Sequence, residues 1–147
     1  MSASYVLARL AGADVAIASD MVEAVVDLAA IVPAPATPPA VSGLSALRSR
    51  VVTVVDPGLV LGTRATRGRR AMVVALDGHD YALLVDRVDD VAALEPVALA
   101  DGIALSEQWR SVACAMALGG GAGDGAPRIV IDLRVLLRHA TAQAALA

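Results

Sequence analysis

The stretch VSGLSALRSRVVTVVDPGLVL, from Val41 to Leu61, carries the strongest local information about the fold. It begins with a glycine turn and passes through a basic island, Arg48-Ser49-Arg50. A run of β-branched residues then leads from Val51 to Val55 and ends at Asp56. Because β-branched side chains favour strands, the stretch predicts a buried strand preceded by exposed cations. We interpret it as a place where a β core meets a partner.

Short alternating or β-branched runs surround this stretch and predict a chain made mainly of strands. They lie at residues 5–10, 14–18, 21–28, 44–47, 51–55, 70–76, 79–85, 87–94, 111–118 and 128–131. Asp77-Gly78 is a strong signal for a two-residue hairpin turn. Four prolines between Ile31 and Pro39 exclude a helix or a central strand there. Pro96 is expected to end the strand that begins at residue 87.

Two aspartates are expected to begin helices. Asp56 precedes Pro57 and predicts a short helix that ends near Gly62. Asp132 precedes an apolar stripe that predicts a C-terminal helix over residues 133–146. The segments at residues 63–68, 101–109 and 119–127 are predicted to be irregular, the last because it holds five glycines.

An internal repeat gives the most informative pattern. Residues 8–25 align with residues 74–91 at a constant offset of 66. The identical pairs are Leu10/Leu76, Gly12/Gly78, Asp14/Asp80, Ala16/Ala82, Asp20/Asp86, Val22/Val88 and Val25/Val91. A second match pairs residues 54–56 with 130–132 at an offset of 76. We therefore predict one domain over residues 1–147, built from two small five-stranded β-barrels at about residues 5–62 and 69–138, with few, short helices.

Composition excludes several functional classes. The net charge is −3 and all 12 cationic residues are arginine, so the basic footprint of a nucleic-acid-binding protein is missing. The basic cluster of Arg64, Arg67, Arg69 and Arg70 is interpreted as a solvated loop. A single cysteine, Cys114, rules out an internal disulfide and is interpreted as a small core residue. No signal sequence or membrane-length apolar run is present, so we expect a soluble cytoplasmic protein without membrane insertion.

No arrangement in the sequence is typical of an enzyme. His79 and His139 lie outside any cluster with metal-ligand spacing. Ser42 is the nearest candidate nucleophile, but it lacks the G-x-S-x-G pattern. The glycine-rich segment after residue 118 lacks the Lys-Ser/Thr pair of a phosphate-binding loop. We expect no catalytic residues, no metal and no cofactor, whereas Arg48 is well suited to bind a partner's carboxylate.

The ordered set of these segments resembles the CheW family of bacterial chemotaxis coupling proteins. The segments are DVAI at 14–17, VEAV at 22–25, VSGLSALR at 41–48, VVTVVD at 51–56, LLVDRVDDV at 83–91 and IVIDL at 129–133. They run from about residue 5 to residue 138. The chain departs from the family pattern at Ser49, where Gly is usual, and at Pro57, where Leu is usual.

The resemblance implies two SH3-like barrels in a non-enzymatic adaptor. Its partners would be the cytoplasmic tip of a chemoreceptor and the regulatory domain of a CheA-type histidine kinase, at receptor arrays on the membrane. The segment from Gly43 to Arg48 would belong to the receptor-facing surface.

Four other residues are candidates for the same receptor-facing surface. Glu23 and Asp86 either rim the same surface or are exposed strand charges, and Met21 and Val85 are either contacts or core. The kinase-facing residues stay unassigned. Two alternatives remain: a CheW-like protein of another receptor and kinase pathway, or a small ligand-binding or hydrolase-like β protein.

Overall fold

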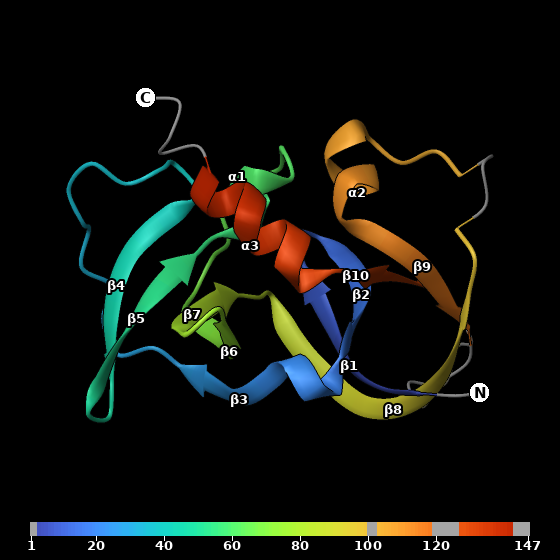
Figure 1. Ribbon diagram of the computed structural model, residues 1–147, viewed down its shortest axis with the longest axis horizontal. Coiled ribbons are helices and arrows are strands. Elements are labelled where there is room, and N and C mark those ends of the chain that lie inside the picture. Colours follow the sequence, from blue (N-terminus) through green and yellow to red (C-terminus); the bar gives the residue numbers. More distant parts are fainter. Residues whose placement is uncertain (1–2, 100–102, 119–126, 143–147) are drawn as a thin grey trace.

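A computed structural model describes residues 3–99, 103–118 and 127–142, and Figure 1 shows its course. The strands are β1 (Ala3–Leu10), β2 (Ala13–Ala18), β3 (Val22–Asp27), β4 (Val41–Leu47), β5 (Arg50–Val55), β6 (Arg70–Leu76), β7 (His79–Leu84), β8 (Arg87–Val97), β9 (Ala113–Leu118) and β10 (Arg128–Ile131). The helices are the 3-10 turn η1 (Ser19–Met21), α1 (Pro57–Val60), α2 (Glu107–Val112) and α3 (Leu133–Ala142). The prediction of a mainly β chain with short helices is confirmed.

The strands form two five-stranded sheets. One is a closed barrel with the order β1-β2-β10-β9-β8, and the other is an open sheet with the order β3-β6-β7-β5-β4. The closed barrel lies on the right of Figure 1 and the open sheet on the left. Each sheet holds one parallel pair, β2 with β10 and β5 with β7, and its remaining pairs are antiparallel.

The two sheets do not follow the two halves of the sequence. Hairpin β1–β2 belongs to the same barrel as β8, β9 and β10, whereas hairpin β6–β7 belongs to the same sheet as β3, β4 and β5. The expected barrels at residues 5–62 and 69–138 are therefore corrected: each half contributes its first hairpin to the other half's sheet. The second edges of β2 and β7 are taken by the parallel partners β10 and β5, and the chain crosses to the other sheet after each hairpin.

The repeated hairpins have the same turn geometry. Ala11 and Gly12 have φ values of 50° and 79°, and Asp77 and Gly78 have 52° and 79°. Two consecutive positive φ angles are the signature of the two-residue turn that matches the twist of paired strands. Glycine stands at both position 12 and position 78 because each turn needs a positive φ angle there.

Both predicted helix caps are present. The Asp56 carboxylate accepts a hydrogen bond from the Gly58 amide at 3.0 Å, and Pro57 occupies the first turn of α1. The Asp132 carboxylate accepts from the Arg134 amide at 3.0 Å. Buried Leu133, Leu136, Leu137 and Ala140 form the apolar stripe of α3. Both caps satisfy amides that would otherwise lack partners at the helix start.

The main core lies between the two sheets and beneath α3. It joins side chains from both repeated hairpins, among them Leu10, Ile17, Met72 and Leu83, with the buried face of α3. Figure 1 shows α3 above the junction of the sheets. Two smaller apolar clusters fill the closed barrel and the open sheet. Because the hairpin strands face a core on both sides, their sequences are almost continuously apolar.

Three local predictions are wrong. β8 continues through Pro96, which stands opposite Ala117 of β9; proline stays in a strand where its missing N–H is not needed by a neighbour. Residues 107–112 form α2, which Ser106 caps through its hydroxyl and the Trp109 amide, instead of an irregular segment and the start of a strand. Cys114 is exposed on β9 instead of lying in the core.

Parts of two predictions lie outside the described residues, namely most of the glycine-rich segment and the helix beyond residue 142. Within the described residues, no helix has the length and apolarity needed to cross a membrane.

Candidate partner-binding surface

The β4–β5 hairpin carries the segment that the sequence analysis singled out. Leu47 pairs with Arg50, so Arg48 and Ser49 form a two-residue turn at the tip of the hairpin. Arg48 has a φ of 56°, a left-handed conformation that favours glycine and costs a larger residue free energy. Its side chain is exposed and has no hydrogen-bond or ion-pair partner among the described residues. Arg48 is therefore a cation available to a partner.

Arg50 behaves differently from its neighbour. Its guanidinium donates to Glu23 of β3 at 2.9 Å and to Asp80 of β7 at 3.0 Å. The hydrogen bond with Glu23, followed by the charge of Asp80, raises the pKa of Arg50 above its ordinary value. In the sheet order β6 and β7 lie between β3 and β5, so the ion pair of Arg50 with Glu23 shows that the open sheet is strongly curled at this end.

A cleft of about 550 Å³ lies between β3 and the tip of the β4–β5 hairpin. It is lined by Glu23, Ala24 and Val26 of β3 and by Leu47, Arg48, Ser49 and Arg50 of the hairpin. The structure thus brings two predicted residues, Glu23 and Arg48, to one site. Glu23 is already bound to Arg50, so a partner reaching it would compete with that ion pair. Arg48 faces no such competition.

The outer face of the same hairpin is apolar. Val51 is 64% exposed, Leu44 is 38% exposed, and Val32, which forms a β-bridge with Leu44, is 62% exposed. Ala46 stands directly opposite Val51 in the register and is also exposed. These four residues form what we call the hairpin patch. Exposed apolar side chains that lie together are a stronger indication of an interaction surface than scattered ones are.

Gly43 has a structural role in β4 and is buried. Its φ is 146°, and a Cβ at this position would lie 2.2 Å from the carbonyl oxygen of Val32. The glycine therefore lets the segment at Val32 come close enough to bond with Leu44 through two backbone hydrogen bonds, both of 2.8 Å. Gly43 therefore shapes the backbone of β4 without offering a side chain to a partner.

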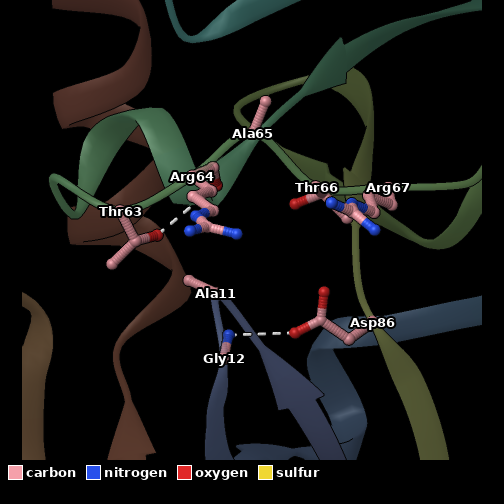
Figure 2. A pocket seen from close by; sticks show the side chains of 8 residues that line it. All are labelled: Ala11, Gly12, Thr63, Arg64, Ala65, Thr66, Arg67 and Asp86. Atoms are coloured by element: carbon pink, nitrogen blue, oxygen red, sulfur yellow. Dashed lines mark hydrogen bonds between the residues drawn. The ribbon is translucent and has the colours of Figure 1, made fainter.

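The other three predicted contacts lie away from the cleft. Val85 is 1% exposed and belongs to the main core, so the core alternative holds for it. Met21 is half-buried at the end of η1 and also packs against the main core. Asp86 is exposed but lines a different cavity, where its carboxylate accepts from the Gly12 amide at 2.9 Å (Figure 2). The structure does not bring the six predicted residues to one surface.

The sequence does not identify Arg50, which lines the cleft, or Asp80, which binds Arg50. Arg50 was seen only as part of a basic island, and Asp80 only as one member of the repeat pair Asp14/Asp80. The repeat did hold a signal: Asp14 also pairs with arginine, through Arg9 at 3.2 Å and Arg87 at 3.7 Å. An aspartate placed just after each hairpin turn thus bonds an arginine in both halves.

The candidate catalytic groups do not form a reactive arrangement. His79 Nδ1 lies 3.3 Å from the Asp77 carbonyl oxygen, and the centre of its ring lies 6.4 Å from that of Tyr81. His139 lies 3.4 Å from the Ser111 hydroxyl, but that hydroxyl donates to the Gln108 carbonyl oxygen at 2.6 Å. Within the described part of the chain, no carboxylate bonds either imidazole, and no cluster of three His, Cys, Asp or Glu side chains could hold a metal.

The Cys114 thiol lies beside Val130 on the neighbouring strand and donates weakly to its carbonyl oxygen at 3.5 Å. Partial burial, and then the charge of Asp132, raises the pKa of this thiol above its ordinary value. A raised pKa disfavours the thiolate, which is the reactive form. The surroundings of Cys114 therefore disfavour the reactive form of its thiol.

Comparisons with known proteins bear on the family of the chain. The family model described as "CheW-like domain" matches residues 4–141. Among solved structures, the scaffolding protein TtCheW from Thermoanaerobacter tengcongensis matches with a TM-score of 0.77 and 22% sequence identity, over 92% of each chain. This likeness shows that the two chains share a fold of two SH3-like subdomains. A comparison with curated protein sequences gave no match. Because the family model covers almost all of the residues, the chain belongs to the CheW-like domain family.

Proposed function

We propose that this protein is a non-enzymatic adaptor that couples chemoreceptors to a CheA-type histidine kinase. Members of the CheW-like family are scaffolds, which supports a role in chemotaxis coupling. The observation that carries the proposal is the β4–β5 hairpin, which offers an unpaired cation on one side and an apolar patch on the other. Two chemically different surfaces on one hairpin suit a protein that holds two partners together.

We assign the cleft at Arg48 to the receptor tip. The segment Gly43–Arg48 is the part of the chain that resembles the receptor-facing surface of the family. An unpaired guanidinium can make two parallel hydrogen bonds to a carboxylate on a partner helix, and it gains strength as the partner excludes water. Glu23, held 2.9 Å from Arg50, would keep the cleft wall in place beside it.

We assign the hairpin patch to the regulatory domain of the kinase. The patch consists of Val32, Leu44, Ala46 and Val51, which lie on the outer face of the hairpin. Burying apolar side chains of this kind is the main source of affinity in protein interfaces. With both partners on one hairpin, a change in the receptor could bias the kinase through the shared geometry. The protein would then work in the cytoplasm at membrane-associated receptor arrays.

The test measures binding of a receptor-tip fragment and of a kinase regulatory domain to three variants by calorimetry. Arg48→Glu should weaken receptor binding by about tenfold or more, because it replaces a charge-assisted hydrogen bond with repulsion. Val51→Asp should weaken kinase binding and leave receptor binding intact. Arg138→Glu is the matched control, because Arg138 is also exposed and unpaired among the described residues but lies on α3.

Arg48→Glu retains a side chain at φ 56°, so the backbone cost at the turn is the same in both proteins. If folded Arg48→Glu and Val51→Asp both bind their partners as the parent does, the hairpin is not the coupling surface. If the parent protein binds neither fragment, the adaptor proposal itself fails for this pathway.

A further inference from the structure

A second cavity lies away from the hairpin, at the junction between the two sheets. Its volume is about 330 Å³, and its lining comes from three segments: the β1–β2 turn, the connector from α1 to β6, and the link between β7 and β8. Figure 2 shows Arg64 and Arg67 on one wall, with Asp86, Ala11 and Gly12 facing them. This cavity takes no part in the adaptor proposal above.

The wall that carries the two arginines is fixed by buried hydrogen bonds. The carboxylate of Asp56, which is 3% exposed, accepts from the Thr66 amide at 2.9 Å and from the Thr66 hydroxyl at 2.7 Å. The Thr63 amide donates to the Gly58 carbonyl oxygen at 2.8 Å. A Cβ on Gly58 would lie 2.0 Å from the Arg64 carbonyl oxygen, so the connector packs directly on α1. The backbone of Arg64 and Arg67 is thus held in place before any ligand arrives.

The two guanidinium groups have no partner of their own. Neither Arg64 nor Arg67 makes a side-chain hydrogen bond or ion pair with a described residue. The facing carboxylate of Asp86 is held by the Gly12 amide through one oxygen at 2.9 Å. Figure 2 shows its second oxygen pointing toward the arginine-bearing connector. The cavity therefore offers two unpaired guanidinium groups as donors and the second carboxylate oxygen of Asp86 as an acceptor.

We propose that this cavity is an oxyanion-binding site, which takes a phosphate monoester or a carboxylate between Arg64 and Arg67. A guanidinium group can donate two parallel hydrogen bonds to the oxygens of a phosphate or of a carboxylate. Two arginines on a fixed backbone can therefore bind one anion together. Asp86 limits the affinity for a plain anion by repulsion. The shared chemistry is an oxygen anion held by the two guanidinium groups.

The experiment follows amide shifts of the ¹⁵N-labelled full chain during titration with phenyl phosphate and, separately, with glutarate. Sodium chloride at matched ionic strength gives the baseline. We expect saturable shifts at the amides of Gly12, Thr66 and Asp86. The two titrations distinguish the phosphate from the carboxylate source, and saturable binding of either one supports the site.

Variants test the assignment of the ligand-binding groups. Arg64→Gln with Arg67→Gln should weaken binding about tenfold or more, as expected for lost charge-assisted hydrogen bonds. Arg134→Gln with Arg138→Gln removes the same charge from exposed positions on α3 and should leave binding unchanged. Asp86→Asn should tighten binding about threefold, the effect of one unit charge several ångströms away in a water-like medium.

The proposal is overturned if the parent shows only the unsaturable response that chloride also gives, which means an adventitious ion only. It is also overturned if the Arg64 and Arg67 double variant, folded by circular dichroism, binds as tightly as the parent. Either result would leave the adaptor proposal standing, because the cleft at the hairpin and this cavity share no lining residue.

Discussion

Replacing Gly43 by alanine is expected to destabilise the fold far more than a glycine-to-alanine change usually does. The new Cβ would lie 2.2 Å from the carbonyl oxygen of Val32 and 2.7 Å from its carbonyl carbon. Both are backbone atoms, which cannot rotate away as a side chain could. The segment at Val32 must therefore leave β4, and the two 2.8 Å hydrogen bonds between Val32 and Leu44 are lost.

The magnitude follows from the backbone conformation and the lost hydrogen bonds. A side chain at φ 146° costs about 1–2 kcal/mol. The two lost backbone hydrogen bonds cost about 1 kcal/mol each. The free energy of unfolding should therefore fall by about 3–4 kcal/mol, which for a chain of this size lowers Tm by about 10 °C. Urea unfolding followed by circular dichroism measures the change.

Gly78→Ala is the matched control. Gly78 also has a positive φ, 79°, but a Cβ there would meet no atom within 4 Å. Only the backbone conformation is penalised, so the control should lose about 1 kcal/mol. The reasoning is refuted if Gly43→Ala costs no more than Gly78→Ala, because the close approach of Val32 would then contribute nothing.

Two further predictions concern Asp56 and Cys114. Asp56→Ala removes the acceptor for the Gly58 amide, the Thr66 amide and the Thr66 hydroxyl, so we expect a loss of about 3 kcal/mol, measured by urea unfolding; Asp56→Asn, which keeps one acceptor oxygen, should lose less, and an equal loss would contradict the account. Cys114 should react with iodoacetamide more slowly in the folded chain than in urea at pH 8, because its pKa is raised and the thiolate is scarcer. As pH rises, the unfolded thiol ionises first, so this group lowers stability in alkaline solution; equal alkylation rates would show that the surroundings of Cys114 do not protect it.

Local sequence patterns were enough to predict most of the strands, the Asp77-Gly78 hairpin turn with its repeat partner at Gly12, and both aspartate caps. These features depend on neighbours in the chain: a positive φ at Gly12 and Gly78, and a carboxylate just before a helix at Asp56 and Asp132. Similar reasoning could have found α2, because Ser106 stands where a helix cap is expected. The strand through Pro96 could not be foreseen, since it depends on which strands flank the proline.

The candidate site was only partly predictable. Arg48 was singled out for its place between apolar runs, and the structure leaves it unpaired at a cleft. Arg50 lies two positions away in the same basic island, yet Glu23 and Asp80 hold it. The difference arises because Arg48 lies in the turn whereas Arg50 begins β5, and the carboxylates that bind Arg50 come from strands distant in sequence. Val85 shows the same limit: nothing nearby in sequence reveals that the main core covers it.

The sequence by itself determined that the chain is a doubled set of strands with a repeated hairpin and a repeated strand–aspartate–helix ending. Only the tertiary structure decided that the two hairpins are exchanged between the sheets. The physical reason lies in the repeat itself. Since the hairpins are alike, each can pair with the remaining strands of either half, and local patterns cannot distinguish the two arrangements. The parallel pairing of β2 with β10 and of β7 with β5 joins residues that lie far apart along the chain, and burial of the shared core holds that arrangement together.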